Sequence, residues 1–139
     1  MLGGHMIKAW SSTQPNITLF SGEAEFVGVT RAAAVTLGIR SLLTDLGARL
    51  KPQLWTDSSA AIGICKRRGL GKVRHLAVAD LWIQDHLRSN DFALTKVKGS
   101  DNPADALTKF VDKATLDKHL AFMTLECIDG RAESAPQID

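Results

Sequence analysis

The chain has 139 residues, of which 45% are hydrophobic and 23% are charged, a balance typical of one globular domain with a single core. The net charge of +2 is uneven, because residues 122–139 hold four acids against one arginine, so the acidic end follows a mildly basic body. No apolar run approaches the ~20 residues that cross a bilayer, and no secretory leader follows Met1. The sequence therefore predicts an intracellular protein, cytoplasmic or nuclear, without a membrane segment.

The first predicted elements are a strand at Met6–Trp10 and an extended segment at Ile17–Phe20, separated by the breaker sequence SSTQPN. A long helix follows, with Ser21 as its N-cap and Gly47 as the residue that ends it. Residues at alternating i+3 and i+4 spacing predict the face that this helix turns to the core. They are Glu25, Gly28, Ala32, Val35, Ile39, Leu42 and Leu46.

The middle of the chain predicts a strand at Gln53–Thr56, which leads through Asp57 into a second helix at Ala60–Cys65. A basic loop with glycines, Lys66–Lys72, precedes a third helix at about Val73–Ser89. One apolar face of this third helix is predicted to be core, and it consists of Leu76, Ala79, Ile83 and Leu87.

The last predicted strand, Phe92–Lys98, alternates apolar and polar residues. Asn102 and Pro103 suit the N-cap and first residue of a short helix, and a final helix is predicted at Ala114–Met123. Strands alternating with helices indicate an α/β domain spanning residues 1–123, with 124–139 as a flexible acidic tail. The cysteines have no metal-ligand spacing, so both are predicted to be free thiols.

Three carboxylates stand at ends of predicted elements, and each has a structural and a functional interpretation. Glu25, like Glu23, favours a helix N-terminus electrostatically, or it faces a ligand site. Asp57 is an N-cap, with the two following serines as substitutes, or a ligand at the carboxyl end of a strand. Asp105 completes a capping box with Asn102, or it joins the same site. Together, three such acids are the hard oxygen donors that a pair of Mg²⁺ ions ~4 Å apart takes to cut a phosphodiester.

The densest basic cluster lies in and after the predicted loop. It suits the phosphate backbone of a nucleic acid, and an ordinary solvated loop explains it as well. Its members are Lys66, Arg67, Arg68, Lys72 and Arg74.

Four segments occur in an order that resembles the ribonuclease H domain of copia-type LTR retrotransposon Pol polyproteins. They read SSTQPNITLFSGEAEF, TDSSAA, GLGKVRHLAVADLWIQ and SDNPADALTKF. The similarity runs from about Gly3 to Phe110, in order and with few gaps. It implies an α/β fold of the ribonuclease H type, a mixed sheet flanked by helices.

By this resemblance, Glu25, Asp57 and Asp105 match the second, third and fourth acids of the family's catalytic quartet. The family uses two Mg²⁺ or Mn²⁺ ions to hydrolyse the RNA strand of RNA–DNA hybrids. The hybrid, and a reverse transcriptase domain in the same polyprotein, are thus the implied partners.

The family's first two strands, and the aspartate on the first of them, have no counterpart in this sequence. We therefore expect a ribonuclease H domain truncated at its N-terminus, either part of a longer protein or a degenerate copy, and weakly active or inactive alone. The missing strands would leave sheet edges open, which is a route to self-association. The alternative is a non-catalytic remnant of the same fold that binds nucleic acid or protein.

Overall fold

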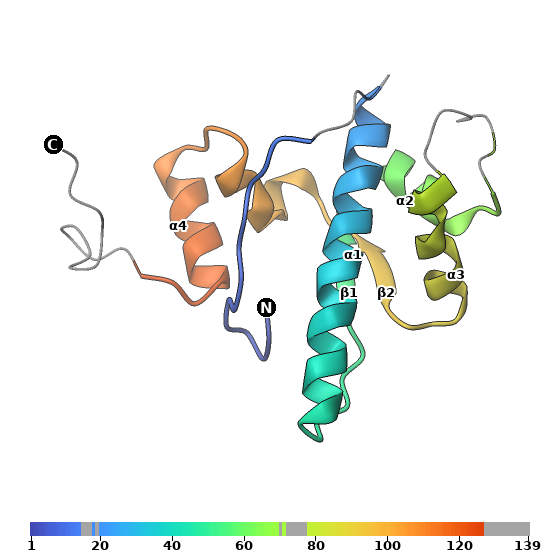
Figure 1. Cartoon of the computed structure of the whole chain (residues 1–139). Coiled ribbons are helices and arrows are strands. Elements are labelled where there is room, and N and C mark those ends of the chain that lie inside the picture. The colour runs from blue at the N-terminus through green and yellow to red at the C-terminus, as the bar shows by residue number, and fades with distance from the viewer. Residues whose placement is uncertain (15–17, 19, 70, 72–77, 127–139) are drawn as a thin grey trace, which may run out of the picture. The chain divides into compact units, whose positions relative to one another are not determined.

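The structure is a computed structural model that describes residues 1–14, 18, 20–69, 71 and 78–126 (Figure 1). The chain divides into two compact units: Met1–Ser12 with Pro103–Asp139, and Thr13–Asn102. Within the described ranges the protein is mixed α/β, with four α-helices and a two-stranded parallel sheet. The predicted α/β class is thus confirmed.

Helix α1, Ser21–Asp45, begins and ends through identifiable backbone contacts. Its N-cap is Phe20, whose carbonyl accepts from the N–H of Glu23 at 3.0 Å, so the predicted cap at Ser21 is wrong by one residue. At the other end the prediction is confirmed. Gly47 adopts φ +86°, and its N–H donates to Thr44 O while Ala48 N–H donates to Leu43 O, the bond pair of a Schellman stop.

The face of α1 that packs on the core differs from the predicted stripe. Glu25 and Leu42 are exposed, and Phe26 and Ala33 are fully buried. The large side chain of Phe26 and its β-branched neighbours set the rotation of the helix in this half, because they bury more apolar area than Gly28 and Ala32 of the predicted stripe. The buried residues are Gly22, Glu23, Phe26, Val27, Val29, Thr30 and Ala33.

By length and hydropathy alone, α1 is a helix that could cross a membrane, so the prediction that nothing in the chain reaches this length is wrong. The same properties belong to the core helix of a compact domain. In the structure α1 packs against helix α2, Ser59–Lys66, and strand β1, Gln53–Thr56 (Figure 1).

Strand β1 pairs in parallel with strand β2, Ala93–Lys96, with Leu54 opposite Leu94. The bounds of β1 are as predicted, and β2 lies inside the predicted Phe92–Lys98. The predicted strand Met6–Trp10 is wrong: these residues are irregular, and the nearest pairing is a single bridge between Leu2 and His5. Apolar residues form a strand only where a neighbour supplies hydrogen bonds, which a local pattern does not reveal.

The predicted third helix is divided in the structure. A 3₁₀ turn, Val78–Leu81, leads into helix α3, Trp82–Arg88, and residues 73–77 of the predicted helix lie outside the described ranges. Ile83 is fully buried and Leu87 packs on the core, as predicted. The core of the larger unit lies between α1, α2, α3 and one face of the sheet. It contains Phe26, Val27, Val29, Ala33, Leu54, Ala61, Ile64, Cys65, Ile83, Phe92 and Leu94.

The smaller unit contains a 3₁₀ helix, Pro103–Leu107, and helix α4, Lys113–Phe122, one residue offset from the predicted last helix. Asp112 caps α4 by accepting from the N–H of Thr115 at 3.0 Å, which holds the pKa of Asp112 below its ordinary value. After α4, Thr124 Oγ1 donates to the carbonyl of Gly4 at 3.2 Å. This bond joins the two ends of the chain within the unit.

Candidate functional site

The carboxyl ends of the two parallel strands form one edge of the larger unit. The pairing continues one residue past β2, because Val97 N–H donates to the carbonyl of Thr56, the last residue of β1, at 3.0 Å. Asp57 follows β1 directly, and the turn after β2 passes beside it: a Cβ added to Gly99 would lie 3.5 Å from Asp57 Oδ2. In α/β proteins this end of a parallel sheet is where ligands bind.

Asp57 is not the N-cap of α2, so the structural interpretation of this residue is wrong. Ser58 is the cap, and its Oγ accepts from the N–H of Ala61 at 3.1 Å. Ser58 N–H in turn donates to Thr56 Oγ1 at 3.2 Å. Because the serine satisfies the helix end, the half-buried carboxylate of Asp57 is available for another purpose.

The first turn of α1 packs on the first turn of α2, close to this edge. A Cβ added to Gly22 would lie 2.6 Å from the Cβ of Ala60, so the backbones approach as closely as a glycine allows. The acidic turn of α1 therefore lies beside the helix that Asp57 precedes. In this turn Glu25 is exposed, and the prediction that it faces the core is wrong.

Glu23, and not Glu25, is the buried acid of this turn, with 1% of its surface exposed. Sequence reasoning favoured Glu25 because it extended an i+3 and i+4 series through Gly28 and Ala32. The signal for Glu23 was its own spacing, three residues before Phe26 and four before Val27, which places it on the face of the largest apolar residues.

Asp105 lies in the smaller unit, in the 3₁₀ helix Pro103–Leu107. Its Oδ1 is 3.1 Å from Lys109 Nζ, and its backbone carbonyl accepts from the N–H of Lys109 at 2.8 Å. Before it in the chain, Asn102 N–H donates to Gly99 O at 3.1 Å, and the capping box of Asn102 and Asp105 stays a prediction.

The donor types fit a hard divalent cation, since carboxylate oxygens are what Mg²⁺ and Mn²⁺ bind. Asp57 and Glu25 belong to the larger unit and Asp105 to the smaller one. Among the residues that the structure describes, no three of His, Cys, Asp and Glu group together as a metal site. The convergence of the three predicted acids therefore remains a prediction.

Lys96 adds a cation to the edge that carries Asp57. It is the last residue of β2, and its Nζ donates to the hydroxyl of Ser59 at the start of α2. Lys96 could not be selected from the sequence, because a lysine on a half-exposed strand is common and its neighbours in space depend on the register of the sheet.

The predicted basic cluster is described in part. Lys66 ends α2 and is exposed, Arg67 follows as the C-cap and is half-buried, and Arg68 is exposed. Lys72 and Arg74 lie outside the described ranges. The described members thus place two basic side chains at the surface, directly after the helix that Asp57 precedes.

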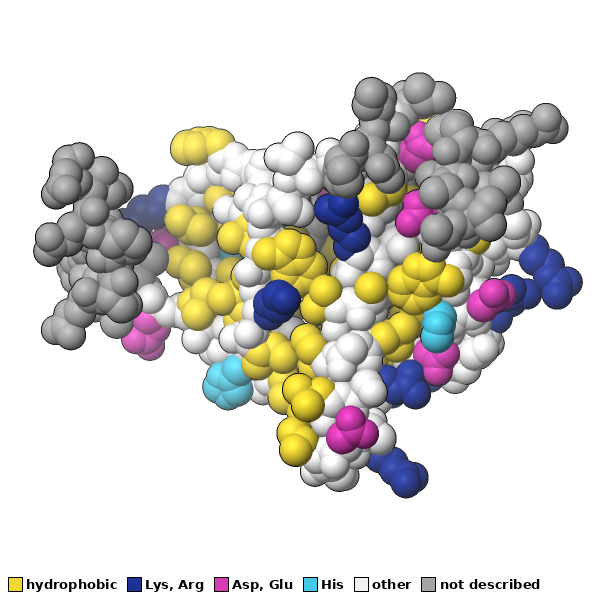
Figure 2. Space-filling model, viewed as in Figure 1, with side chains coloured by type: hydrophobic (Ala, Val, Ile, Leu, Met, Phe, Trp, Pro, Cys, Tyr) yellow, Lys and Arg dark blue, Asp and Glu magenta, His cyan; other side chains and the backbone are white. Residues whose placement is uncertain are grey.

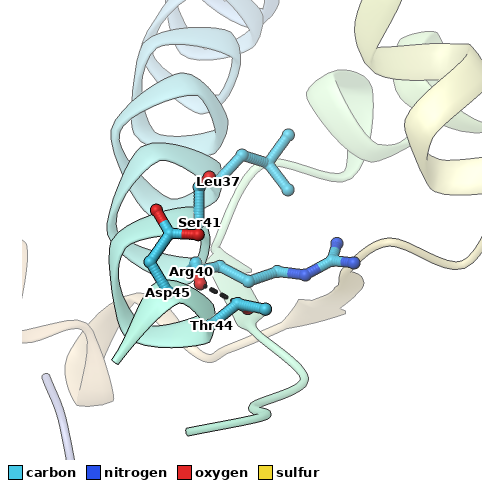
Figure 3. Close-up of a pocket in the computed structure, with 5 residues that line it drawn as sticks. All are labelled: Leu37, Arg40, Ser41, Thr44 and Asp45. Atoms are coloured by element: carbon cyan, nitrogen blue, oxygen red, sulfur yellow. Dashed lines mark hydrogen bonds between the residues drawn. The ribbon is translucent and has the colours of Figure 1, made fainter. Parts of the chain in front are cut away.

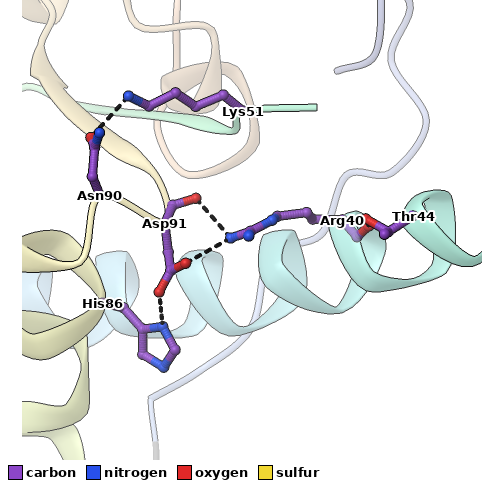
Figure 4. Close-up of polar contacts among 6 residues, drawn as sticks. All are labelled: Arg40, Thr44, Lys51, His86, Asn90 and Asp91. Carbon is purple, nitrogen blue, oxygen red and sulfur yellow. Dashed lines mark hydrogen bonds and ion pairs between the residues drawn. The ribbon is translucent and has the colours of Figure 1, made fainter. Parts of the chain in front are cut away.

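A polar network ties the C-terminal half of α1 to the loop before β2 (Figure 4). Arg40 Nη1 donates to the carbonyl of Asp91 at 3.0 Å and to its Oδ1 at 3.1 Å, and His86 Nδ1 lies 2.7 Å from Asp91 Oδ2. The hydrogen bonds from Arg40 and then His86 hold the pKa of Asp91 below its ordinary value. These residues satisfy one another, so the network is structural.

The same half of α1 has a shallow pocket of about 270 Å³, lined by Leu37, Arg40, Ser41, Thr44 and Asp45 (Figure 3). All five side chains come from one helix, and Thr44 Oγ1 is already bound to the carbonyl of Arg40 at 2.8 Å. Hydrophobic side chains also reach the surface over the C-terminal end of α1 (Figure 2), where Leu42 and Leu46 are exposed. No convergent polar groups mark this region as a reaction site.

Comparison with known proteins relates the chain to polyproteins of transposons. It is 29% identical over 124 residues to the retrovirus-related Pol polyprotein from transposon TNT 1-94 of Nicotiana tabacum, covering 86% of this chain and 9% of that protein. It is 32% identical over 111 residues to that of transposon RE1 of Arabidopsis thaliana, covering 78% and 8%. The RE2 polyprotein of the same plant is 31% identical over 111 residues, again covering 78% and 8%.

These similarities support an origin in a retrotransposon Pol polyprotein. The chain spans less than a tenth of the length of these relatives, so a polyprotein of this kind has other domains besides the matched segment. No family model matches the chain. No solved structure matches it either.

Proposed function

We propose that the chain is the ribonuclease H-like part of a retrotransposon Pol polyprotein, which hydrolyses the RNA strand of RNA–DNA hybrids. The observation that carries the proposal is the position of Asp57. It stands at the carboxyl end of a parallel strand, at the end of the sheet where ligands bind, and the helix cap next to it is made by Ser58. The similarity to transposon Pol polyproteins supports the polyprotein origin on which the proposal relies.

In this proposal Glu25, Asp57 and Asp105 hold two Mg²⁺ or Mn²⁺ ions, which would activate water and stabilise the leaving oxygen. Asp57 contributes from a rigid position, because the pairing of β1 and the cap of α2 fix the backbone on both sides of it. Glu25 contributes from the first turn of α1, and its exposure leaves the carboxylate accessible to a cation. Asp105 would contribute from the 3₁₀ helix Pro103–Leu107, where its Oδ1 lies 3.1 Å from Lys109 Nζ.

Binding of the hybrid would come from the basic residues after α2. Lys66 and Arg68 are exposed, and they suit contacts with the phosphate backbone, which carries most of the affinity for nucleic acids. Recognition of the RNA strand relies on its 2′-hydroxyls in a wide, shallow minor groove, so little sequence preference is expected. The partner within the polyprotein would be its reverse transcriptase domain.

A second candidate is a non-catalytic module of the same origin that binds nucleic acid. It is favoured by one observation: the described residues contain no group of three metal-binding side chains. By the resemblance, the family's first catalytic aspartate also has no counterpart among the 139 residues. We therefore expect the chain alone to cut slowly, and the two candidates differ in whether any metal-dependent cutting occurs.

The test is cleavage of a labelled RNA–DNA hybrid in Mg²⁺ and in Mn²⁺, with EDTA as the metal-free control. Asp57→Asn should abolish cutting, and Asp45→Asn, which changes an exposed acid at the far end of α1, should leave it unchanged. Duplex DNA and single-stranded RNA should stay intact. Binding of the hybrid without cutting, by protein shown to be folded by circular dichroism, would favour the non-catalytic candidate.

A further inference from the structure

A single buried side chain, Gln84 of α3, is bound to the segment that carries the basic residues. It is 3% exposed. Its Oε1 accepts from the N–H of Gly69 at 2.8 Å, and its Nε2 donates to the carbonyl of Gly69 at 3.1 Å. The same Nε2 donates to the carbonyl of Ile64 at 2.9 Å. One amide thus binds both polar groups of one loop residue and one of the last four carbonyls of α2.

This arrangement fixes the chain on both sides of Lys66, Arg67 and Arg68. Ile64 lies in α2 before them and Gly69 directly after them, so the three basic residues are held between two points on the same side chain. Gly69 adopts φ +71°, a left-handed conformation that residues with a Cβ rarely take. The path of the segment therefore depends on Gln84 and on a glycine at 69.

Arg67 is placed in an unusual environment by this path. Its Nε and Nη2 are buried, and none of the residues that the structure describes offers them an acceptor. A Cβ added to Gly71 would lie 2.8 Å from Arg67 Nη1, so the chain folds closely over the guanidinium. Two nitrogens of this half-buried arginine thus lack an acceptor among the described residues, and a phosphate oxygen is a partner that matches the geometry of a guanidinium.

We propose that Gln84 is a positioning residue that holds the Lys66–Gly69 segment in the conformation that contacts the phosphate backbone of a nucleic acid. This inference rests on the proposed binding of nucleic acid and names a residue outside the basic cluster on which that binding depends. Without Gln84 the segment would have to be ordered at each binding event, and the entropy of that ordering would weaken the complex.

The test compares binding of an RNA–DNA hybrid by the whole chain and by Gln84→Met, which keeps the volume and removes the hydrogen bonds. Gln84→Met should bind on the order of eightfold more weakly at 0.1 M salt, the effect of losing about one phosphate contact, and its salt dependence should be shallower by about one charge. The control is Gln53→Met, which changes an exposed glutamine at the start of β1 and should bind like the unaltered chain.

A readout without nucleic acid separates this inference from the proposed function. Trypsin cuts after Lys66, Arg67 and Arg68, and cutting after Arg49, in an exposed loop, serves as the internal reference. Cutting within the segment should be faster in Gln84→Met than in the unaltered chain. Gly69→Ala, which disturbs the same path through the backbone, should show the same increase and covers the case in which Gln84→Met fails to fold.

Coupling to Arg68 distinguishes positioning from general stability. If Gln84 acts through the basic segment, Arg68→Ala should weaken binding less in the Gln84→Met background than in the unaltered chain. Equal binding by Gln84→Met and the unaltered chain, or unchanged trypsin cutting, would overturn the inference. If the unaltered chain binds no nucleic acid, the proposed function fails first and the positioning role fails with it.

Discussion

The comparison of Ser58→Ala with Asp57→Ala tests whether the serine, and not the aspartate, caps α2. In the structure Ser58 Oγ accepts from Ala61 N–H at 3.1 Å, and this is the bond that its replacement removes. Loss of such a cap destabilises a protein by about 1 kcal/mol. Asp57 lies one position before the cap, where its interaction with the helix dipole adds about 0.3 kcal/mol to the stability of the protein.

For a chain of this length an unfolding entropy of roughly 2 cal/mol/K per residue converts 1 kcal/mol into a Tm change of about 3 °C. Thermal melts by circular dichroism, supported by urea titrations, should therefore show a lower Tm for Ser58→Ala and a nearly unchanged Tm for Asp57→Ala. The urea m value should stay constant, as expected when only stability changes. An Asp57→Ala variant as destabilised as Ser58→Ala, or more so, would refute the reasoning and return Asp57 to a structural role.

Three further predictions follow from packing and ionisation. Gly22→Ala should destabilise the protein by about 1–3 kcal/mol, because the added Cβ would lie 2.6 Å from the Cβ of Ala60. Gly28→Ala, whose added Cβ would have nothing within 4 Å, should stabilise it by about 0.5–1 kcal/mol. Urea unfolding measures the free energy of unfolding of both variants. The pKa of Asp91 is lower in the folded protein than in the unfolded chain, so the ionised carboxylate stabilises the fold above the ordinary carboxyl pKa. This stability is lost as the pH falls through the lower folded pKa. The free energy of unfolding of Asp91→Asn should therefore depend less on pH in the acid range than that of the unaltered chain. Burial raises the pKa of the Cys65 thiol to about 12. In a Cys127→Ser background, this thiol should therefore react with a disulfide reagent only as fast as the core opens. Reaction at the rate of an exposed thiol would contradict the burial of Cys65.

Local chemistry made some elements predictable from the sequence. Strand β1 and the glycine stop of α1 were found where expected, because both depend on residues within a few positions of one another. The short apolar run at Met6–Trp10 shows the limit of such reasoning. Its composition suits a strand, and its state in the structure depends on whether a pairing partner exists.

The sequence was enough to name candidate site residues, and whether they form one site stays a prediction. Asp57 follows β1 as predicted, and the bond from Ala61 N–H to Ser58 Oγ shows that Asp57 is not the cap of α2, while its role as a ligand stays a prediction. The rotation of α1 decided which glutamate is buried, and a helix with apolar residues on several sides does not encode that rotation in its period. Gln84 could not be found from its spacing, because its partners are 15 and 20 residues away along the chain.

The most direct test of the central claim is the binding of Mn²⁺ to the chain in the presence of an RNA–DNA hybrid, followed by electron paramagnetic resonance. Asp57→Asn is compared with Asp45→Asn, since both remove one carboxylate charge from the larger unit. The unaltered chain and Asp45→Asn should bind Mn²⁺ alike, and Asp57→Asn should bind it much more weakly. Equal Mn²⁺ affinity in all three proteins would contradict the assignment of Asp57 as a metal ligand.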